Sequence, residues 1–109
     1  MAAVTAREAT DLLIVYHIHD DRIRERILEF IKQRNHCMLS GSTYAIKTTE
    51  DPDSVAGALR ELLEHVNNGS VYVFPIGRPV YGLGNKEANE WLKRSIPLSG
   101  LRMEIIATR

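Results

Sequence analysis

The hydrophobic pattern of the chain predicts strands and helices in alternation. Residues 12–19 form a run rich in Leu, Ile and Val, which predicts a buried strand. Asp20 and Asp21 follow as candidate N-caps of a helix that runs to about residue 34. The apolar positions of this helix recur at helical spacing: Ile23, Ile27, Phe30 and Ile31. A strand followed by an amphipathic helix is therefore the first predicted unit.

Two strands and a second helix are predicted next. Residues 36–48 are interrupted by a Ser-Gly-Ser turn signal at residues 40–42, which predicts a short strand, a tight turn and a strand over residues 43–48. Asp51 is a candidate N-cap, and Pro52 suits the first helical position because its missing N–H costs nothing there. The apolar stripe of this helix is Val55, Leu59, Leu62, Leu63 and Val66.

A third unit is predicted after a stop signal at residues 67–69. Residues 71–76 predict a strand, and Pro75 near its end indicates a sheet edge or a bulge. A loop rich in Gly and Pro covers residues 77–84. Asn85 then caps a third helix with one apolar face made by Ala88, Trp91 and Leu92.

The fold class follows from the order of these elements. Residues 97–100 break the third helix, and residues 101–108 predict a closing strand. The order β-α-β-β-α-β followed by α-β predicts an α/β (α+β) protein. It is the ferredoxin-like split β-α-β arrangement with a C-terminal helix–strand extension.

The pattern of the first strand predicts that both faces of the sheet are covered. Successive strand residues point to opposite faces, and apolar residues occur on both faces of this strand. Helices of this fold cover only one face, so the other needs a second cover. We expect a homodimer that buries the face carrying Leu13, Val15 and His17. The alternative is that the third helix packs over this face within one chain.

Composition sets the outer limits. A chain of 109 residues suits one domain, expected over residues 12–109 after a flexible N-terminal tail at residues 1–11 that lacks the apolar core of a signal peptide. The lone Cys37 excludes an intrachain disulfide, which fits a reducing, cytoplasmic location. No run approaches the length needed to span a bilayer. Lys plus Arg and Asp plus Glu number 14 each, so no global field attracts nucleic acid.

Four segments carry a resemblance to a known family. They are Leu13-Ile14-Val15-Tyr16, Ser42 to Thr48, Val71-Tyr72-Val73-Phe74, and Glu87 to Lys93. In order, spacing and residue character they resemble the small CRISPR-associated Cas-two proteins and their SinR-like and VapD-like relatives. The resemblance implies a ferredoxin-like homodimer, related to metal-dependent nucleases and to proteins that scaffold nucleic acid.

The same resemblance points to an altered catalytic position. Its members usually end the first strand with an aromatic residue and then an Asp, which can hold a divalent metal at the dimer axis. This chain has Tyr16 followed by His17, and Mg²⁺ prefers carboxylate oxygen to imidazole. Asp20 could substitute only if the strand ended early. The candidate catalytic residues are His17, Asp20 and Ser42.

Two histidines near the end of the first strand are candidate metal ligands. His17 and His19 lie on one face with Asp20 adjacent, and paired imidazoles with a carboxylate suit Zn²⁺ or a similar divalent ion. His36 and Cys37 could contribute from the neighbouring strand. The alternative is that both histidines bond to backbone or water, since the chain has no H-E-x-x-H or C-x-x-C spacing.

Two further segments are candidate binding sites. Arg22 and Arg26 share a helix face and could grip a nucleic-acid backbone, or this face is solvated and balanced by glutamates. Gly82, Gly84 and Lys86 form a candidate phosphate or ligand loop at a helix start. The alternative is a flexible connection, because the segment matches no established phosphate-loop motif.

The leading functional hypothesis is a Cas-two-like homodimer that binds nucleic acid or a protein partner and has a lost or altered metal-nuclease site. One alternative is an active divalent-metal-dependent endonuclease that uses Asp20 or the histidines. Another is a small-ligand regulatory module that uses the loop at residues 77–86. A basic groove across the dimer would favour nucleic acid, and a closed apolar pocket near Gly82 would favour a ligand.

Overall fold

The computed structural model describes residues 8–64, 68–77, 80–95 and 107–108. Its helices and strands, in chain order, are β1 (Thr10–Ile18), α1 (Asp21–Lys32), β2 (Asn35–Ser40), β3 (Thr43–Thr48), α2 (Pro52–Leu62), β4 (Gly69–Pro75), β5 (Leu83–Gly84), α3 (Lys86–Ser95) and β6 (Ala107–Thr108). Four of the strands form one antiparallel sheet in the order β2-β3-β1-β4. The protein is therefore an α+β fold, compatible with the class predicted from the sequence.

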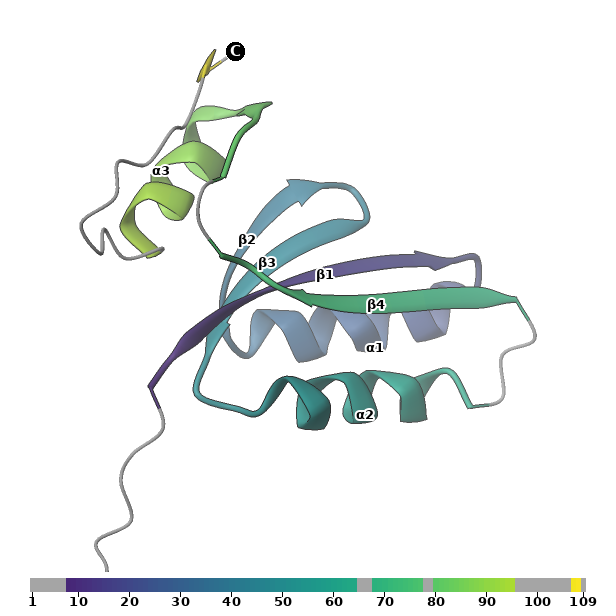
Figure 1. Ribbon diagram of the computed structural model, residues 1–109. Helices are drawn as coiled ribbons and strands as arrows, with labels where there is room; N and C mark the ends of the chain where they lie inside the picture. Colours follow the sequence, from purple (N-terminus) through teal and green to yellow (C-terminus); the bar gives the residue numbers. More distant parts are fainter. Residues whose placement is uncertain (1–7, 65–67, 78–79, 96–106, 109) are drawn as a thin grey trace, which may run out of the picture.

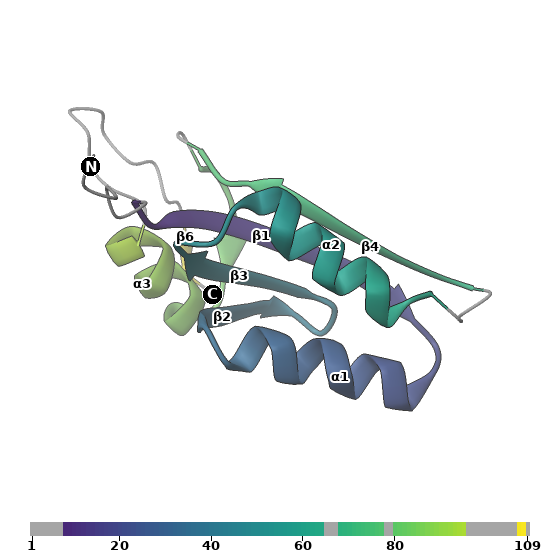
Figure 2. The same ribbon diagram turned by 90° about the horizontal axis from the view of Figure 1, so that it is seen from below.

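Helices lie on both sides of this sheet. The helices α1 and α2 lie together under one face, as seen from the side in Figure 1 and from below in Figure 2. In the second view α2 runs beside β4, and α1 lies nearer β2. The third helix, α3, lies on the opposite side, at one end of the sheet (Figure 1). The two faces of the sheet therefore have different covers.

The starts of α1 and α2 confirm the predicted caps. Asp20 has extended backbone angles, and its Oδ1 accepts a hydrogen bond from the N–H of Ile23 at 3.2 Å. Asp51 accepts from the N–H of Asp53 at 3.3 Å, and Pro52 occupies the first turn of α2. These contacts satisfy backbone donors that a helix leaves unpaired at its N-terminus.

The core lies between α1, α2 and one face of the sheet. The alternate β1 residues Leu12, Ile14 and Tyr16 are almost completely buried against the two helices. The other members of the core are Ile18, Ile27, Ile31, Tyr44, Ile46, Val55 and Leu59. Burial raises the pKa of the Tyr16 hydroxyl above its ordinary value, with a smaller contribution from Tyr44. Apolar burial on this face provides most of the driving force for folding.

Several boundaries differ from the predicted ones. β1 begins at Thr10, so the last two residues of the predicted tail are part of the sheet, while residues 1–7 lie outside the described residues. Within the predicted loop, Leu83 and Gly84 form β5 and pair in parallel with β6. Of the predicted closing strand only residues 107–108 are described. None of the described helices is long and apolar enough to cross a membrane.

Candidate interaction face

The sheet face turned away from α1 and α2 is the candidate functional surface, and we call it the open face. It carries Leu13, Val15 and His17 of β1, which alternate with the core residues of that strand. The register of the sheet places further residues beside these three on the same face: Thr43, Ala45, Ser70, Tyr72 and Phe74. The predicted two-sided character of β1 is therefore reproduced in the sheet.

One half of the open face is covered within the chain by α3. The Trp91 indole N–H donates a hydrogen bond to the Asn35 side chain at 3.0 Å. The Lys47 ammonium donates to the Ser95 carbonyl at 2.9 Å. Ala45, which is two residues before Lys47 on β3 and opposite Leu13 in the register, is fully buried. The alternative in which the third helix packs over this face is thus realised for the part near β2 and β3.

The other half of the open face exposes aromatic side chains. Tyr72 is 60% exposed and Phe74 is 50% exposed, although both are large and partly apolar. Their rings stack with centroids 6.2 Å apart and an interplanar angle of 27°. Leu13 and Val15 are opposite these rings in the register of β1 and β4 and are only partly buried. An exposed cluster of this kind indicates an interaction surface.

His17 and His19 lie at the edge of this exposed half. Both are exposed, and their rings meet edge to face with centroids 4.6 Å apart. His17 is opposite Ser70, which provides no carboxylate. Within the described residues, no group of three or more His, Cys, Asp or Glu side chains is placed to hold a metal ion. The pair matches the predicted juxtaposition, but it has no third ligand among these residues.

The other candidate catalytic residues have structural contacts. Asp20 lies beyond the end of β1, and one of its carboxylate oxygens is occupied by the cap of α1. Ser42 lies in the turn between β2 and β3, where its carbonyl accepts a hydrogen bond from the N–H of Tyr16 at 3.1 Å. β1 continues to Ile18, so it does not end early enough to bring Asp20 to the place of His17.

The proposed contribution of His36 and Cys37 to a histidine site is wrong. β3 lies between β1 and β2, and the register places Cys37 opposite Ala45 and hence across from Leu13, well before His17 along β1. The ring Nδ1 of His36 lies 2.8 Å from the carbonyl of Arg34. Burial raises the pKa of the Cys37 thiol, helped by the nearby Glu87 carboxylate, so the thiol is not activated as a nucleophile.

Arg22 and Arg26 both lie exposed on α1. Neither forms a salt bridge within the described part of the chain. Arg24, by contrast, donates to the Ile18 carbonyl and pairs with Asp21. The two exposed arginines thus lie on the helical side of the sheet, whereas the aromatic cluster lies on the other side.

In the candidate loop at Gly82, Gly84 and Lys86, the neighbouring Asn85 side chain is already bonded to the start of α3. The Asn85 side chain accepts a hydrogen bond from the N–H of Ala88 at 2.8 Å, which confirms the predicted cap of α3. The hollow beside Gly82 has a volume of 200 Å³ and is lined mainly by apolar residues. Pockets for small organic ligands usually enclose about 300 Å³ or more, so the hollow beside Gly82 is smaller than such a pocket. Lys86 instead lines a separate, open hollow of 760 Å³ between α3 and β2.

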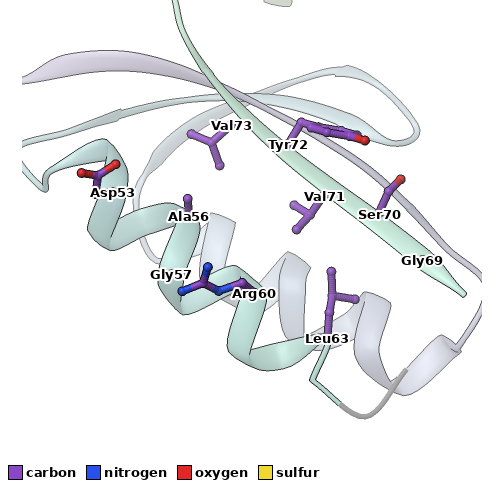
Figure 3. A pocket seen from close by; sticks show the side chains of 10 residues that line it. All are labelled: Asp53, Ala56, Gly57, Arg60, Leu63, Gly69, Ser70, Val71, Tyr72 and Val73. Atoms are coloured by element: carbon purple, nitrogen blue, oxygen red, sulfur yellow. The ribbon is translucent and has the colours of Figure 1, made fainter. Parts of the chain in front are cut away.

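A larger groove runs between α2 and β4, and sequence reasoning did not identify it. Its volume is 610 Å³, and Figure 3 shows the side chains that line it. Residues Asp53, Ala56, Gly57 and Arg60 line it from α2, at the i, i+3, i+4, i+7 spacing of one helix face. These small and charged residues form a stripe beside the apolar stripe of α2, and this stripe was the feature of the sequence that could have revealed the groove. Tyr72 and Phe74 were also missed, although their two-residue spacing places them on one face.

Comparison of the chain with family models, with curated proteins and with solved structures gives no match.

Proposed function

We propose that this chain is a ferredoxin-like, Cas-two-like interaction module that works as a homodimer and lacks Mg²⁺-dependent nuclease chemistry. The sheet order and the two helices on one face support the ferredoxin-like assignment, because the split β-α-β arrangement has this topology. The observation that carries the functional part is the exposed stack of Tyr72 and Phe74 on the uncovered half of the open face.

A second copy of the chain is the partner that this surface favours. The exposed half combines Leu13, Val15 and two aromatic rings and carries no Lys or Arg side chain from β1 or β4. Binding to nucleic acid depends mainly on cationic groups that neutralise phosphates. A mostly apolar surface instead favours an isologous contact, in which the same patch on two copies becomes buried.

The site is poorly suited to the nuclease alternative. Phosphodiester hydrolysis with metal help needs hard oxygen ligands that place Mg²⁺ against the phosphate. On the open face, His17 and Ser70 occupy the end of the β1–β4 ladder, and Asp20 caps α1. These residues provide no pair of free carboxylates at that place.

Static light scattering at micromolar concentration tests the proposed dimer. We expect the wild-type chain, whose mass is 12.3 kDa, to behave as a particle of about twice that mass because obligate interfaces persist at this concentration. A variant with Tyr72→Glu and Phe74→Glu should be monomeric, since charges would enter the buried patch. Both side chains point away from the core, so circular dichroism should be unchanged.

Tyr81→Glu is the matched control. Tyr81 is 70% exposed and lies outside the four-stranded sheet, so this variant should keep the wild-type mass. A monomeric wild-type chain, or a double variant that remains dimeric, would contradict the proposed interface.

A further inference from the structure

A second surface, separate from the open face, is found at the outer edge of β4. The two edges of the sheet are β2 and β4. The β2 edge has a register irregularity between Met38 and Ser40 and is contacted by α3, both of which discourage pairing with another strand. β4 spans seven residues, and none of them is charged. It therefore lacks the charged side chains that often protect an exposed edge, and its only protecting residue is Pro75 at its end.

The backbone groups that face outward from β4 can be identified from two hydrogen bonds. The N–H of Ile76 donates to the Asp11 carbonyl at 2.8 Å, so Asp11 faces β4. The N–H of Tyr16 donates to Ser42 of the β2–β3 turn, so Tyr16 faces the opposite side. Residues of an antiparallel strand alternate between their two neighbours. Leu13, Val15 and His17 therefore bond to β4.

Their partners in the register are Phe74, Tyr72 and Ser70. The N–H and C=O groups of the intervening residues, Val71 and Val73, consequently point to the free edge. Pro75 also falls in this outward set, where its missing N–H costs no ladder bond, and this confirms the edge indicated by the sequence. In the part of the chain that the structure describes, no strand pairs with these groups.

The groove between α2 and β4 lies directly beneath this edge. Its apolar lining includes Ala56, Leu63, Val71 and Val73, and a Cβ placed on Gly57 meets no heavy atom within 4 Å. A strand added to β4 would direct every second side chain into this groove, because side chains of neighbouring strands keep the same alternation. The small residues of α2 leave room for those side chains.

The charges of the groove define the sequence of such a strand. Asp53 lies toward the Val73 end of the groove, and Arg60 lies nearer the Gly69 end (Figure 3). Arg60 follows Asp53 by seven helical positions, or about 10 Å along the axis. Neither side chain forms an ion pair within the described ranges. A strand antiparallel to β4 meets Asp53 first and Arg60 last, so its groove-facing residues should run basic, apolar, acidic.

We propose that the β4 edge and the groove beside it bind an extended peptide segment of a partner protein by β-strand addition. The segment carries a basic, an apolar and an acidic residue at alternate positions and runs antiparallel to β4. Main-chain hydrogen bonds to Val71 and Val73 provide affinity, and the contacts of Asp53 and Arg60 provide direction and selectivity. This site uses the outer edge and the helical side of the sheet, so it does not depend on the proposed dimer.

A labelled synthetic peptide with the core Lys-Thr-Val-Thr-Glu tests the proposal by fluorescence anisotropy with the full chain. We expect saturable binding, and amide shifts at Val71 and Val73 in two-dimensional NMR spectra. The same peptide with an N-methyl group on its central valine should lose binding by at least about tenfold, because a ladder bond is removed while all side chains remain. This control leaves the protein unaltered.

Charge reversal provides the second test. Arg60→Glu should weaken binding of the Lys-Thr-Val-Thr-Glu peptide by at least about tenfold. The same variant should instead bind a peptide in which Lys replaces the terminal Glu. Val15→Glu changes the open face on β1, outside β4 and the groove, and should retain peptide binding, which separates this site from the open face. Equal binding of the N-methylated peptide, or no binding up to about 1 mM, would overturn the proposal. The proposal would also be overturned if the peptide dissociated a wild-type dimer, because the β4 edge would then be the site that binds the second copy of the chain.

Discussion

The Ser95 hydroxyl donates a hydrogen bond to the buried Asp11 carboxylate and thereby joins the last turn of α3 to the first strand of the sheet. The Lys47 ammonium lies 3.4 Å from the same carboxylate and donates to the Ser95 carbonyl. Asp11 is thus paired and hydrogen-bonded at once, as a buried charge requires. This three-residue contact holds α3 over one half of the open face.

Asp11→Ala should loosen α3 and destabilise the fold by about 2 kcal/mol, because Lys47 and Ser95 would lose their buried partner. Asp11→Asn keeps an acceptor for Ser95 and should cost less. Trp91, the single tryptophan, lies on α3 and reports its docking by fluorescence. Unchanged fluorescence and unfolding in Asp11→Ala would show that other contacts hold α3.

The Arg34–Glu50 pair should make stability depend on pH. The Arg34 guanidinium donates two hydrogen bonds to the Glu50 carboxylate, at 2.5 and 2.9 Å, and these bonds lower the pKa of Glu50. A lowered pKa contributes stability that is present above the pKa of the unfolded state and is lost as pH falls through that of the folded state. The pair connects the end of α1 to the segment before α2.

Glu50→Gln should therefore reduce the free energy of unfolding by about 1 kcal/mol at pH 7, a value kept small by the partial exposure of the pair. The difference from wild type should shrink as pH falls below about 4.3, the ordinary pKa of a glutamate. Urea unfolding at several pH values measures both. Glu61→Gln on the exposed side of α2 is the matched control and should show no such trend. A pH-independent difference would exclude the lowered pKa as its cause.

The secondary structure could be predicted because local signals and burial agree. Asp20 and the Asp51–Pro52 pair stand immediately before apolar stripes of helical period, and the structure confirms both helix starts. β5 could not be predicted in the same way. It contains only Leu83 and Gly84, and its pairing with Ala107 and Thr108 is a contact between segments distant in sequence.

The site was harder to predict for a related reason. The sequence identified the two faces of β1, but the division of the open face depends on where α3 docks. The docking is decided by the buried contact of Asp11 with Ser95 and by the hydrogen bond between Asn35 and Trp91. The groove at Arg60 depends on the position of α2 relative to an edge strand. His36 and Cys37 were misplaced because chain order does not reveal that β3 separates their strand from β1.

Nucleic acid should bind weakly and only at low salt. The chain has equal numbers of acidic and basic residues, and the exposed Arg22 and Arg26 lie on the helical side of the sheet rather than beside the aromatic cluster. Binding of labelled single-stranded RNA should fall steeply between about 50 and 200 mM salt. Arg22→Ala with Arg26→Ala should reduce the salt dependence. Tight binding at physiological salt would contradict the charge argument.

The last prediction concerns His17, the residue at the position where the resembling family keeps an Asp. We expect the wild-type chain to show no cleavage of DNA or RNA with Mg²⁺ or Mn²⁺, because imidazoles hold Mg²⁺ poorly and protonated ones would repel it. His17 is exposed on the open face, so His17→Asp should fold normally. In the proposed dimer it would bring two carboxylates toward one axis.

Cleavage by His17→Asp but not by wild type would show that the fold keeps the geometry of a metal site and has lost its charge. His19→Asp is the matched control, because His19 is also exposed and its ring centroid lies 4.6 Å from that of His17, yet it lies beyond the end of β1. It should remain inactive. If the wild-type chain cuts and His17→Asp adds nothing, the proposal of a lost site fails, and Asp20→Asn would become the decisive variant. Loss of cleavage in Asp20→Asn would then assign the metal to the carboxylate that caps α1.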